Sequence, residues 1–492
     1  MSSKKQPIGY LPDERPPIVE LILFALQQIV VMFPATVLVA ILTGFHVSTT
    51  IFASGLATLC FILVTGRKIP LYYGSSFSYI AAIASIMGAK QFADMDLNSK
   101  ISIAQFGIVM SGFVSIAAGL IIKRFGRKAI EKVLPSTVTG SIAIIIGLSL
   151  AASAMNNASS YSNPSSVVVN AEDHAEDDIQ NVNLGGVIAN ANNVFTDTEV
   201  SDAKTYSSWS WVIALITLIS TILYSVYLKG KLSQLPILFG LLTGYVSAAI
   251  IGGITGIGFI NFNKTALEGI INLPIFTFPK PSWAAIGAIM PIAIATIPES
   301  TAHIFQLDIY VNDFAKKKGS TKKYNLGDKL GLNLIGDGIG DIVSGAIGGP
   351  AGTNYGENIS AMALSKVFSV PVLIVAAIIT MVISCFTPLV NAVYSIPESV
   401  IGGLSIYLFG VIAAQGITIM MDSKVDMFQS KNLAVIAIIL IIGLGGSFGF
   451  PNGMIPIFGA EFPAIASAAV VGILLNLLLS IGGKKTAVQD NE

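Results

Sequence analysis

The chain has 492 residues, of which 53% are hydrophobic and only 11% charged, and its formal net charge is zero. A soluble globular domain carries about 25% charged residues, so this composition excludes one and indicates a membrane protein. A neutral chain also lacks the basic surface that binds nucleic acid. The two cysteines, Cys60 and Cys385, both fall within apolar runs, which argues against a disulfide framework and against a thiolate metal site.

Apolar segments of about 20 residues, long enough to cross a bilayer, recur along the chain behind a polar N-terminus. Three further segments, near 69–89, 330–348 and 351–366, are short or interrupted by Gly and Pro, and we count them as spans too. The sequence therefore predicts an all-α polytopic membrane protein with about fourteen transmembrane segments. The clear spans are 18–43, 48–66, 101–122, 134–155, 209–228, 235–257, 284–306, 368–390, 399–421, 432–449 and 460–482.

The distribution of basic residues supports this count, because a wrong number of spans would scramble the charges of the loops. With the N-terminus in the cytoplasm, most Lys and Arg residues fall on the cytoplasmic side, including the lysine cluster in 316–323. We therefore predict an inner (plasma) membrane protein with both termini cytoplasmic. The basic residues placed outside are Lys90, Lys100, Lys204, Lys264 and Lys280.

One long segment, 156–208, is polar and acidic and cannot lie in the membrane. We predict a solvated, partly disordered extracellular loop, since acidic segments with few aromatic residues cannot bury enough surface to fold alone. The segment lacks the spacing of an EF-hand, although calcium binding stays an alternative.

Ionisable residues interrupt two of the apolar segments. Glu299 lies in the run 285–305, with His303 one helical turn later, and Glu357 lies in a Gly-rich break within 349–366. Such groups are costly at membrane depth and usually mark a substrate or ion pathway. His303 either satisfies Glu299 as a partner or transfers protons itself. These residues predict a transporter binding site without metal or cofactor.

The chain also looks doubled. The segments 70–83 and 350–364 share a Pro, a short β-favouring stretch, a Gly and a helix of small residues. Fourteen spans divide into seven and seven, and an odd number makes the two repeats inverted in the membrane. Broken spans at corresponding positions are the sequence signal of a transporter's site. The Gly and Ser residues of 74–78 could instead serve only close helix packing.

The chain resembles the nucleobase:cation symporter-2 (nucleobase-ascorbate transporter) family, most closely its bacterial uracil permeases. The resemblance runs from about residue 12 to 482 and implies two inverted repeats of seven segments, with core and gate domains. It also implies short strands in the broken third and tenth segments, near 72–77 and 352–356, and a homodimer formed through the gate. The segments that carry it are 26-LQQIVVMFPATVLVA-40, 72-YYGSSFSYI-80, 297-IPESTAHI-304 and 353-TNYGENISAMALSK-366.

The same resemblance implies domain boundaries. The core domain would consist of 16–132 and 259–393, and the gate domain of 133–258, with the acidic loop, and 394–483. The remaining segments, 1–15 and 484–492, would be a cytoplasmic N-terminus and a cytoplasmic tail.

Residue roles are implied as well. Glu299 and Glu357 would bind the substrate, and Glu299 with His303 would couple transport to protons. The backbone at Phe77 and Gly356 would hydrogen-bond the carbonyls of the base. Tyr355 and Phe409 would complete the substrate site.

Four positions depart from the family pattern, one of them Ser365, which stands where the motif has a threonine. Gln28 stands where uracil permeases carry a histidine, and Phe409 stands where a tyrosine is expected. Ser360 replaces a glycine of the motif after Glu357 and adds bulk beside the site. These departures bear on the choice of substrate more than on the family.

We therefore predict a carrier, not an enzyme: a uracil:proton symporter that works by an elevator-like alternating-access movement. A xanthine or other purine permease of the same family is the alternative. An anion exchanger of the same architecture is less favoured, because it would need a positive site where this chain has two carboxylates. A membrane metalloenzyme is disfavoured because the chain has no HExxH motif and only His46, His174 and His303.

Overall fold

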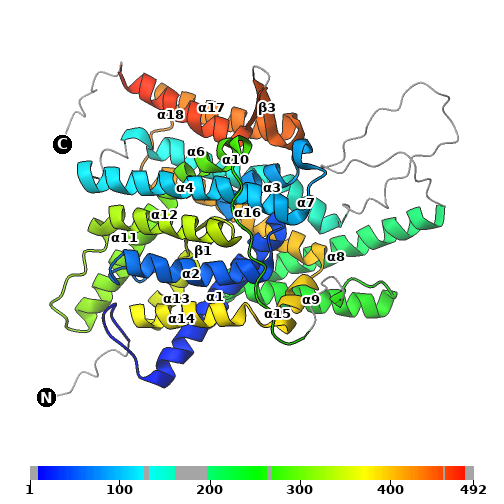
Figure 1. The fold of residues 1–492 in the computed structure, drawn as a ribbon, viewed down its shortest axis with the longest axis horizontal. Helices are drawn as coiled ribbons and strands as arrows, with labels where there is room; N and C mark the ends of the chain where they lie inside the picture. The colour runs from blue at the N-terminus through cyan, green and yellow to red at the C-terminus, as the bar shows by residue number, and fades with distance from the viewer. Residues whose placement is uncertain (1–8, 127–131, 161–196, 263–268, 458–459, 482–492) are drawn as a thin grey trace.

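The computed structural model describes residues 9–126, 132–160, 197–262, 269–457 and 460–481. Within these residues, eleven helices are long and apolar enough to cross a membrane, and two shorter apolar helical stretches lie at Phe77–Met87 and Val370–Ile383. Helix α13 (Gly356–Ser365) adds one more, which gives the fourteen segments that the sequence predicts. The long helices lie side by side, and α1 begins on the same side of the molecule on which α18 ends (Figure 1).

The two halves of the chain repeat one order of elements. The first half contains α1 (Ile18–Thr43), α2 (Val47–Val64), β1 (Tyr73–Ser75), η1 (Phe77–Tyr79), α3 (Ile80–Met87), α4 (Leu97–Phe125), α6 (Ser136–Ser149), α7 (Ala151–Ser159), α8 (Asp197–Tyr227), η4 (Gly230–Gln234) and α9 (Pro236–Thr255). The second half contains α10 (Trp283–Ile289), η6 (Met290–Ile292), α11 (Ala293–Lys317), α12 (Leu330–Ile347), β2 (Gly352–Asn354), α13, α14 (Val370–Ile383), α15 (Thr387–Tyr394), α16 (Glu398–Asp422), α17 (Ser430–Gly449), β3 (Met454–Ile457), β4 (Ala460–Pro463) and α18 (Ala464–Ile481).

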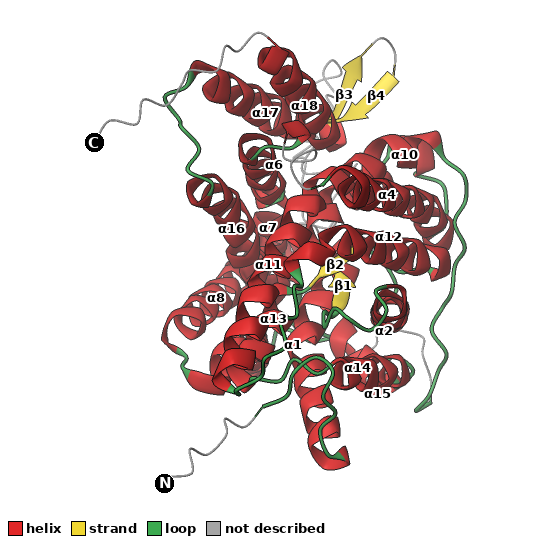
Figure 2. Cartoon of the chain, turned by 90° about the vertical axis from the view of Figure 1, so that its left-hand side faces the viewer, coloured by secondary structure: helices red, strands yellow, loops and turns green. Residues whose placement is uncertain are grey.

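The helices form two groups with the broken segments between them. Figure 2 shows α6, α7, α8, α16, α17 and α18 on one side, α2, α4, α10, α12 and α14 on the other, and the β1–β2 pair in the middle. The packing follows the repeat: α4 packs on α12 and α14 packs on α2, while α8 packs on α16 and α17 packs on α6. By their order in the two halves, α4 corresponds to α14 and α12 corresponds to α2, so the α4–α12 pair corresponds to the α14–α2 pair. In the same way, the α8–α16 pair corresponds to the α17–α6 pair. Two inverted repeats of seven spans account for this pattern.

Glycines allow the closest helix crossings. A β-carbon at Gly112 of α4 would lie 2.5 Å from the carbonyl oxygen of Gly338 in α12, and one at Gly338 would lie 2.3 Å from that of Gly112. Gly140 of α6 and Gly416 of α16 face each other in the same way, at 2.6 and 2.4 Å. Small residues at such crossings let the backbones of membrane helices approach each other closely.

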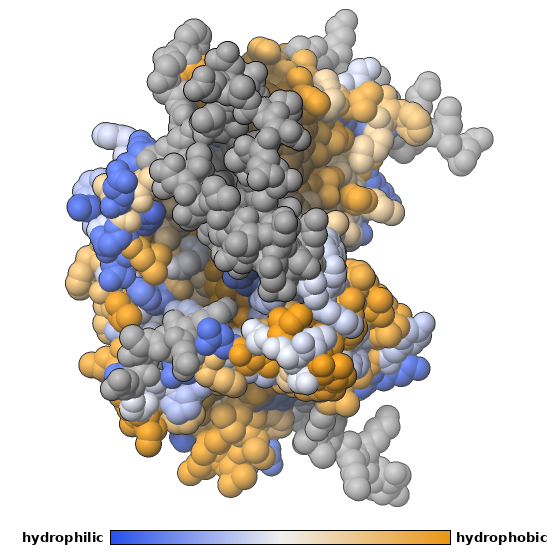
Figure 3. All heavy atoms as spheres, turned by 90° about the vertical axis from the view of Figure 1, so that its right-hand side faces the viewer, coloured by the Kyte–Doolittle hydropathy of each residue, from blue (hydrophilic) through white to orange (hydrophobic). Residues whose placement is uncertain are grey.

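The apolar surface fits a hydrocarbon environment. Large side chains such as Leu223 on α8, Ile250 on α9 and Leu474 on α18 are exposed on the periphery. Figure 3 shows the molecule from one end, with apolar residues (orange) along its lower edge and on its right side. Exposed apolar surface on this scale is not found on soluble monomers, so the chain is a multi-pass membrane protein.

Three sequence predictions are corrected by the structure. The predicted loop 156–208 is helical at both ends, because α7 continues to Ser159 and α8 begins at Asp197; residues 161–196 lie outside the described part. The predicted span 460–482 begins at Ala464, since 460–463 pair with 454–457 as an antiparallel hairpin. The predicted span 368–390 breaks after Ile383, and α15 restarts with Pro388 in its first turn, where a missing N–H is tolerated.

Candidate functional site

The two broken spans meet through their strands. β1 and β2 pair antiparallel over three positions, Tyr73 with Asn354, Gly74 with Thr353 and Ser75 with Gly352. The chain becomes helical directly after each strand, at Phe77 in the first half and at Gly356 in the second. Helix starts expose unpaired backbone N–H groups and a partial positive charge at membrane depth. The sequence prediction of two short strands is confirmed, although each is shorter than predicted.

Glu357 lies in the first turn of α13, immediately after this crossing. The preceding residue, Gly356, faces α11, where a β-carbon at Gly356 would come 2.8 Å from Nε2 of His303. Glu299 lies one turn before His303 on α11, and the Glu299 and Glu357 carboxylates are close enough for their charges to interact. The structure therefore brings together all three ionisable residues that the sequence analysis singled out.

Several groups here still have room for a partner. Among the described residues, Nδ1 of His303 is buried and has no hydrogen-bond partner. Glu299, His303 and Glu357 are only partly buried, whereas their neighbours Tyr355 and Asn358 are buried. A small polar molecule that reaches this point would find carboxylate acceptors, an imidazole and the backbone of two helix starts.

Tyr355 and Asn358 support the site from behind. The Tyr355 hydroxyl donates to the Ser75 carbonyl at 2.9 Å and lies 3.0 Å from Oγ1 of Thr36, so its side chain is used within the protein. The Asn358 amide donates to both oxygens of Gln28, at 3.0 Å to the backbone and 2.8 Å to the side chain. In the sequence, Gln28 is recognisable only as a missing histidine; in the structure, it holds the residue next to Glu357.

Phe77 of η1 and Phe409 of α16 share one apolar cluster. Phe409, in α16, is 2% exposed and belongs to an apolar cluster against which the partly buried Phe77 packs. Ser360, one turn after Gly356 in α13, is exposed. Phe409 and Phe77 thus belong to one apolar region, and Ser360 is free of packing constraints from the protein interior.

Two further carboxylates lie beside the site in α12. In the sequence, the run GDGIGD that contains Asp337 and Asp341 fits either a pathway lining or the cap of a short helix. Both lie well inside α12, so neither caps it. Asn333 donates to Oδ2 of Asp337 at 3.4 Å, and Asn354 of β2 donates to Oδ1 of Asn333 at 3.2 Å. Acids in a Gly-rich apolar helix are the sequence signal for this network, but the link from Asn333 to Asn354 of β2 depends on the fold.

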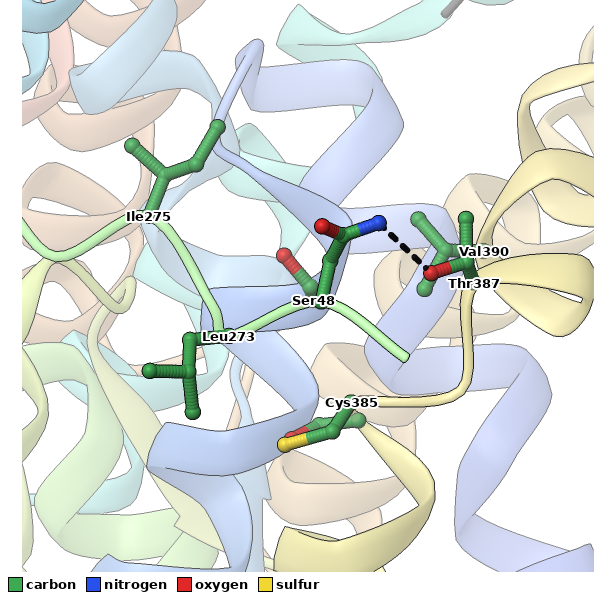
Figure 4. Close-up of a pocket in the computed structure, with 8 residues that line it drawn as sticks. Ser48, Leu273, Ile275, Cys385, Thr387 and Val390 are labelled. Carbon is green, nitrogen blue, oxygen red and sulfur yellow. Dashed lines mark hydrogen bonds between the residues drawn. The ribbon is translucent and has the colours of Figure 1, made fainter. Parts of the chain in front are cut away.

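A small hollow lies elsewhere, between the starts of α2 and α15 and the segment before α10 (Figure 4). Its only hydrogen bond drawn in Figure 4 joins Nδ2 of Asn272 to Oγ1 of Thr387 at 2.9 Å. Its lining contains no carboxylate or imidazole, so it does not compete with the Glu299–Glu357 region as the candidate site. The lining residues are Ser48, Asn272, Leu273, Ile275, Ser384, Cys385, Thr387 and Val390.

Known proteins similar to this chain are permeases. A model described as the permease family matches residues 19–176 and 187–452. The uracil permease of Bacillus caldolyticus is 33% identical over 474 residues, which cover 95% of this chain and 94% of that protein. The putative pyrimidine permease RutG of Escherichia coli (strain K12) is 31% identical, over 95% of this chain and 91% of that protein.

A solved structure shares the fold. The overall structure of SLC26A9 superposes with a TM-score of 0.59 at 12% sequence identity, and the match covers 94% of this chain. This chain spans 65% of the SLC26A9 chain. At this identity the likeness concerns the arrangement of the spans alone.

Proposed function

Because the chain belongs to the nucleobase:cation symporter-2 family of permeases, we propose that it imports uracil together with a proton. The observation that carries the proposal is the meeting of Glu299, His303 and Glu357 at two helix starts in the middle of the fold. Membership of a family of permeases makes the protein a carrier and not an enzyme.

The chemistry of uracil suits these groups. Uracil offers two N–H donors and two C=O acceptors. The Glu299 and Glu357 carboxylates accept hydrogen bonds from the N–H groups, while the backbone amides at Phe77 and Gly356 donate to the carbonyl oxygens. Tyr355 acts through its position at the start of α13, and Phe409 contributes apolar contact. A hydrogen-bonding group left unpaired in such a site would cost about 1–3 kcal/mol. The two carboxylates and two backbone amides therefore favour a base that pairs with all four of them.

Proton coupling uses the acids of the site. Glu299, adjacent to His303, takes up a proton from the outside and releases it inside when the site turns inward. The core domain, 16–132 and 259–393, moves as a body against the gate domain, 133–258 and 394–483, in an elevator-like step. Two gate domains form the homodimer, and the protein lies in the inner (plasma) membrane with both termini in the cytoplasm.

Two alternatives differ in substrate. A purine such as xanthine presents a mixed edge of donors and acceptors, which suits an amide better than the carboxylate of Glu357. An anion exchanger is suggested only by a shared fold, since a solved anion transporter with this fold is 13% identical to this chain. Two carboxylates that face the substrate repel an anion, so an exchanger is disfavoured.

Competition uptake tests the proposal. Labelled uracil is offered at low concentration to cells that lack their own uracil permease and express this chain, with unlabelled pyrimidines, purines or sulfate as competitors. We expect uracil to compete best, xanthine more weakly and sulfate not at all. Stronger competition by xanthine would move the assignment to a purine permease. Absence of uptake of every base by correctly inserted protein would contradict a nucleobase carrier.

A further inference from the structure

A side chain of α12 ties the two crossing strands together. Oδ1 of Asp341 accepts a hydrogen bond from the Tyr73 hydroxyl on β1 and another from the backbone nitrogen of Gly352 on β2, 2.9 Å away. Asp341 is 2% exposed and lies in the interior of α12. A single carboxylate oxygen therefore bonds to both strands at once.

The ring of Tyr73 lies in a slot between two glycines. A β-carbon at Gly340 of α12 would come 2.6 Å from Cε2 of the ring, and one at Gly352 of β2 would come 2.4 Å from Cε1. No real side chain tolerates such contacts, so both positions need glycine. The slot holds the phenol, which is 1% exposed, with its hydroxyl directed at Asp341.

The strands that Asp341 joins carry the ends of the proposed binding site. β1 ends two residues before Phe77, and β2 ends two residues before Gly356. The ladder is three residue pairs long, with one further backbone bond at each end, from Tyr355 to Tyr72 and from Ser76 to Ala351. A pairing this short depends on contacts from the helices around it for its position relative to α12. A buried carboxylate at this depth is expensive unless donors compensate it, and here the Tyr73 hydroxyl and the Gly352 nitrogen, both on the strands, are two of those donors.

Resting on the proposed function, we propose that Asp341 and Tyr73 form a positioning pair that sets the spacing between the Phe77 end and the Glu357 end of the substrate site. Neither residue touches the base. Loss of the pair lets the strands shift relative to α12, and one base then no longer reaches the groups at both ends. The expected consequence is weaker binding by a protein that is still inserted and still able to move.

Four variants test the pair. Tyr73→Phe removes one donor, and Asp341→Ala removes the acceptor of both bonds. Asp341→Asn keeps an oxygen that accepts from both donors. The matched control is Tyr72→Phe, the same change at the neighbouring residue, whose hydroxyl donates to Oγ1 of Thr380 on α14 at 2.9 Å.

We measure uracil uptake kinetics per inserted protein, and uracil binding to the purified variants. Tyr73→Phe and Asp341→Ala should raise KM and Kd at least fivefold with the maximal rate within twofold of wild type. Asp341→Asn should stay within threefold in KM, and Tyr72→Phe should match wild type. If Asp341→Ala is not inserted, the contrast between Tyr73→Phe and Tyr72→Phe still decides.

A purely structural role predicts a different pattern: abundance and maximal rate fall together while KM and Kd stay unchanged. That pattern, or a wild-type KM and Kd in Tyr73→Phe, would overturn the positioning pair and leave the proposed function intact. A wild-type protein that neither binds nor takes up any nucleobase would overturn both.

Discussion

Glu357 lies in the first turn of α13, so its carboxylate could bind the substrate or only cap the helix. Replacing it by glutamine distinguishes these two roles. We predict that Glu357→Gln weakens uracil binding at least tenfold while the protein stays folded and inserted, because the amide places an N–H donor against an N–H of the base. Isothermal titration of the purified variant measures the loss. Glu398→Gln is the control, since Glu398 is also an acid in the first turn of a helix, α16. Equal effects of both changes would mean that Glu357 only caps α13.

Glu299 carries a different prediction, because its neighbour on α11 is His303. We expect Glu299→Gln to damage proton-driven accumulation of uracil at least as much as equilibrium binding, since a glutamine cannot carry the coupled proton. Counterflow, which needs no net proton movement, and gradient-driven uptake are measured side by side in proteoliposomes. Intact rates in both assays would exclude Glu299 as binder and as coupling group.

The sequence predicted these acids because a carboxylate within an apolar run is costly at membrane depth and seldom occurs there without a function. Asp341 was visible for the same reason, but its role was not. Its partner Tyr73 lies 268 residues away in sequence, and the pairing depends on two glycines that make room for the ring. Gln28 was noted as a substitution, yet its bond to Asn358 likewise needs the packing of α1 on α13.

At the scale of elements, the N-terminal strap, residues 9–17, is fastened to the ends of α11 and α13. Backbone nitrogens of Phe368 and Val370 donate to the carbonyls of Tyr10 and Pro12, at 2.7 and 3.0 Å. Nζ of Lys318 bonds to Glu14 at 2.5 Å and to the Gly9 carbonyl at 3.0 Å. The strap therefore lies against the ends of α11 and α13 and links them.

Lys318 and Lys317 provide a matched test of the strap. We predict that Lys318→Met lowers the free energy of unfolding by about 1 kcal/mol, because a partly buried ion pair and the bond to the Gly9 carbonyl are lost. Lys317→Met should change it by less than about 0.5 kcal/mol, since the exposed pair of Lys317 with Asp313 is solvated. Thermal unfolding in detergent compares both variants with wild type. Equal stability of the two variants would show that the strap contributes nothing.

The glycine crossings give a second prediction for elements. Gly416→Ala should lower the unfolding midpoint by several degrees, because the new β-carbon would lie 2.4 Å from the Gly140 carbonyl oxygen. Gly410→Ala on the same helix should not lower it, because no atom lies within 4 Å of a β-carbon there and alanine favours the helix. Thermal unfolding again provides the measurement. A stable Gly416→Ala protein would mean that α6 and α16 can separate without cost.

Most spans could be predicted from the sequence because twenty apolar residues leave few alternatives to a membrane helix. The β3–β4 hairpin could not, since Ala460–Pro463 continues without interruption into the apolar run of α18. The packing of α4 on α12 was also beyond the sequence, because the glycines that permit it, Gly112 and Gly338, look like any others in a Gly-rich chain.

At the scale of the whole molecule, symmetry and glycine packing divide the spans into two tightly packed groups. The α4–α12 and α2–α14 crossings hold one group, and the α6–α16 crossing holds the other. Between the two groups, α13, which packs on α1 and α11, contacts η4, the short helical turn that follows α8. A movement of one group against the other would preserve these close glycine contacts, because each of them lies within one group. It would change only the contacts between the two groups.

The contrast between tight packing within each group and looser contact between the groups leads to a prediction about cross-links. We expect a disulfide between a cysteine in the last turn of α13 and one in η4 to stop uracil uptake, because in an elevator-like mechanism it would tie the core domain to the gate domain. The native Cys60 and Cys385, which form no disulfide, are first replaced by serine. A cysteine pair between α4 and α12 serves as the control, since it joins helices that move together. Oxidation should abolish uptake only in the first variant, reduction should restore it, and uracil binding should persist throughout. Undiminished uptake after complete cross-linking of α13 to η4 would exclude an elevator-like movement at this boundary, and the carrier would then have to expose its site through changes within the core.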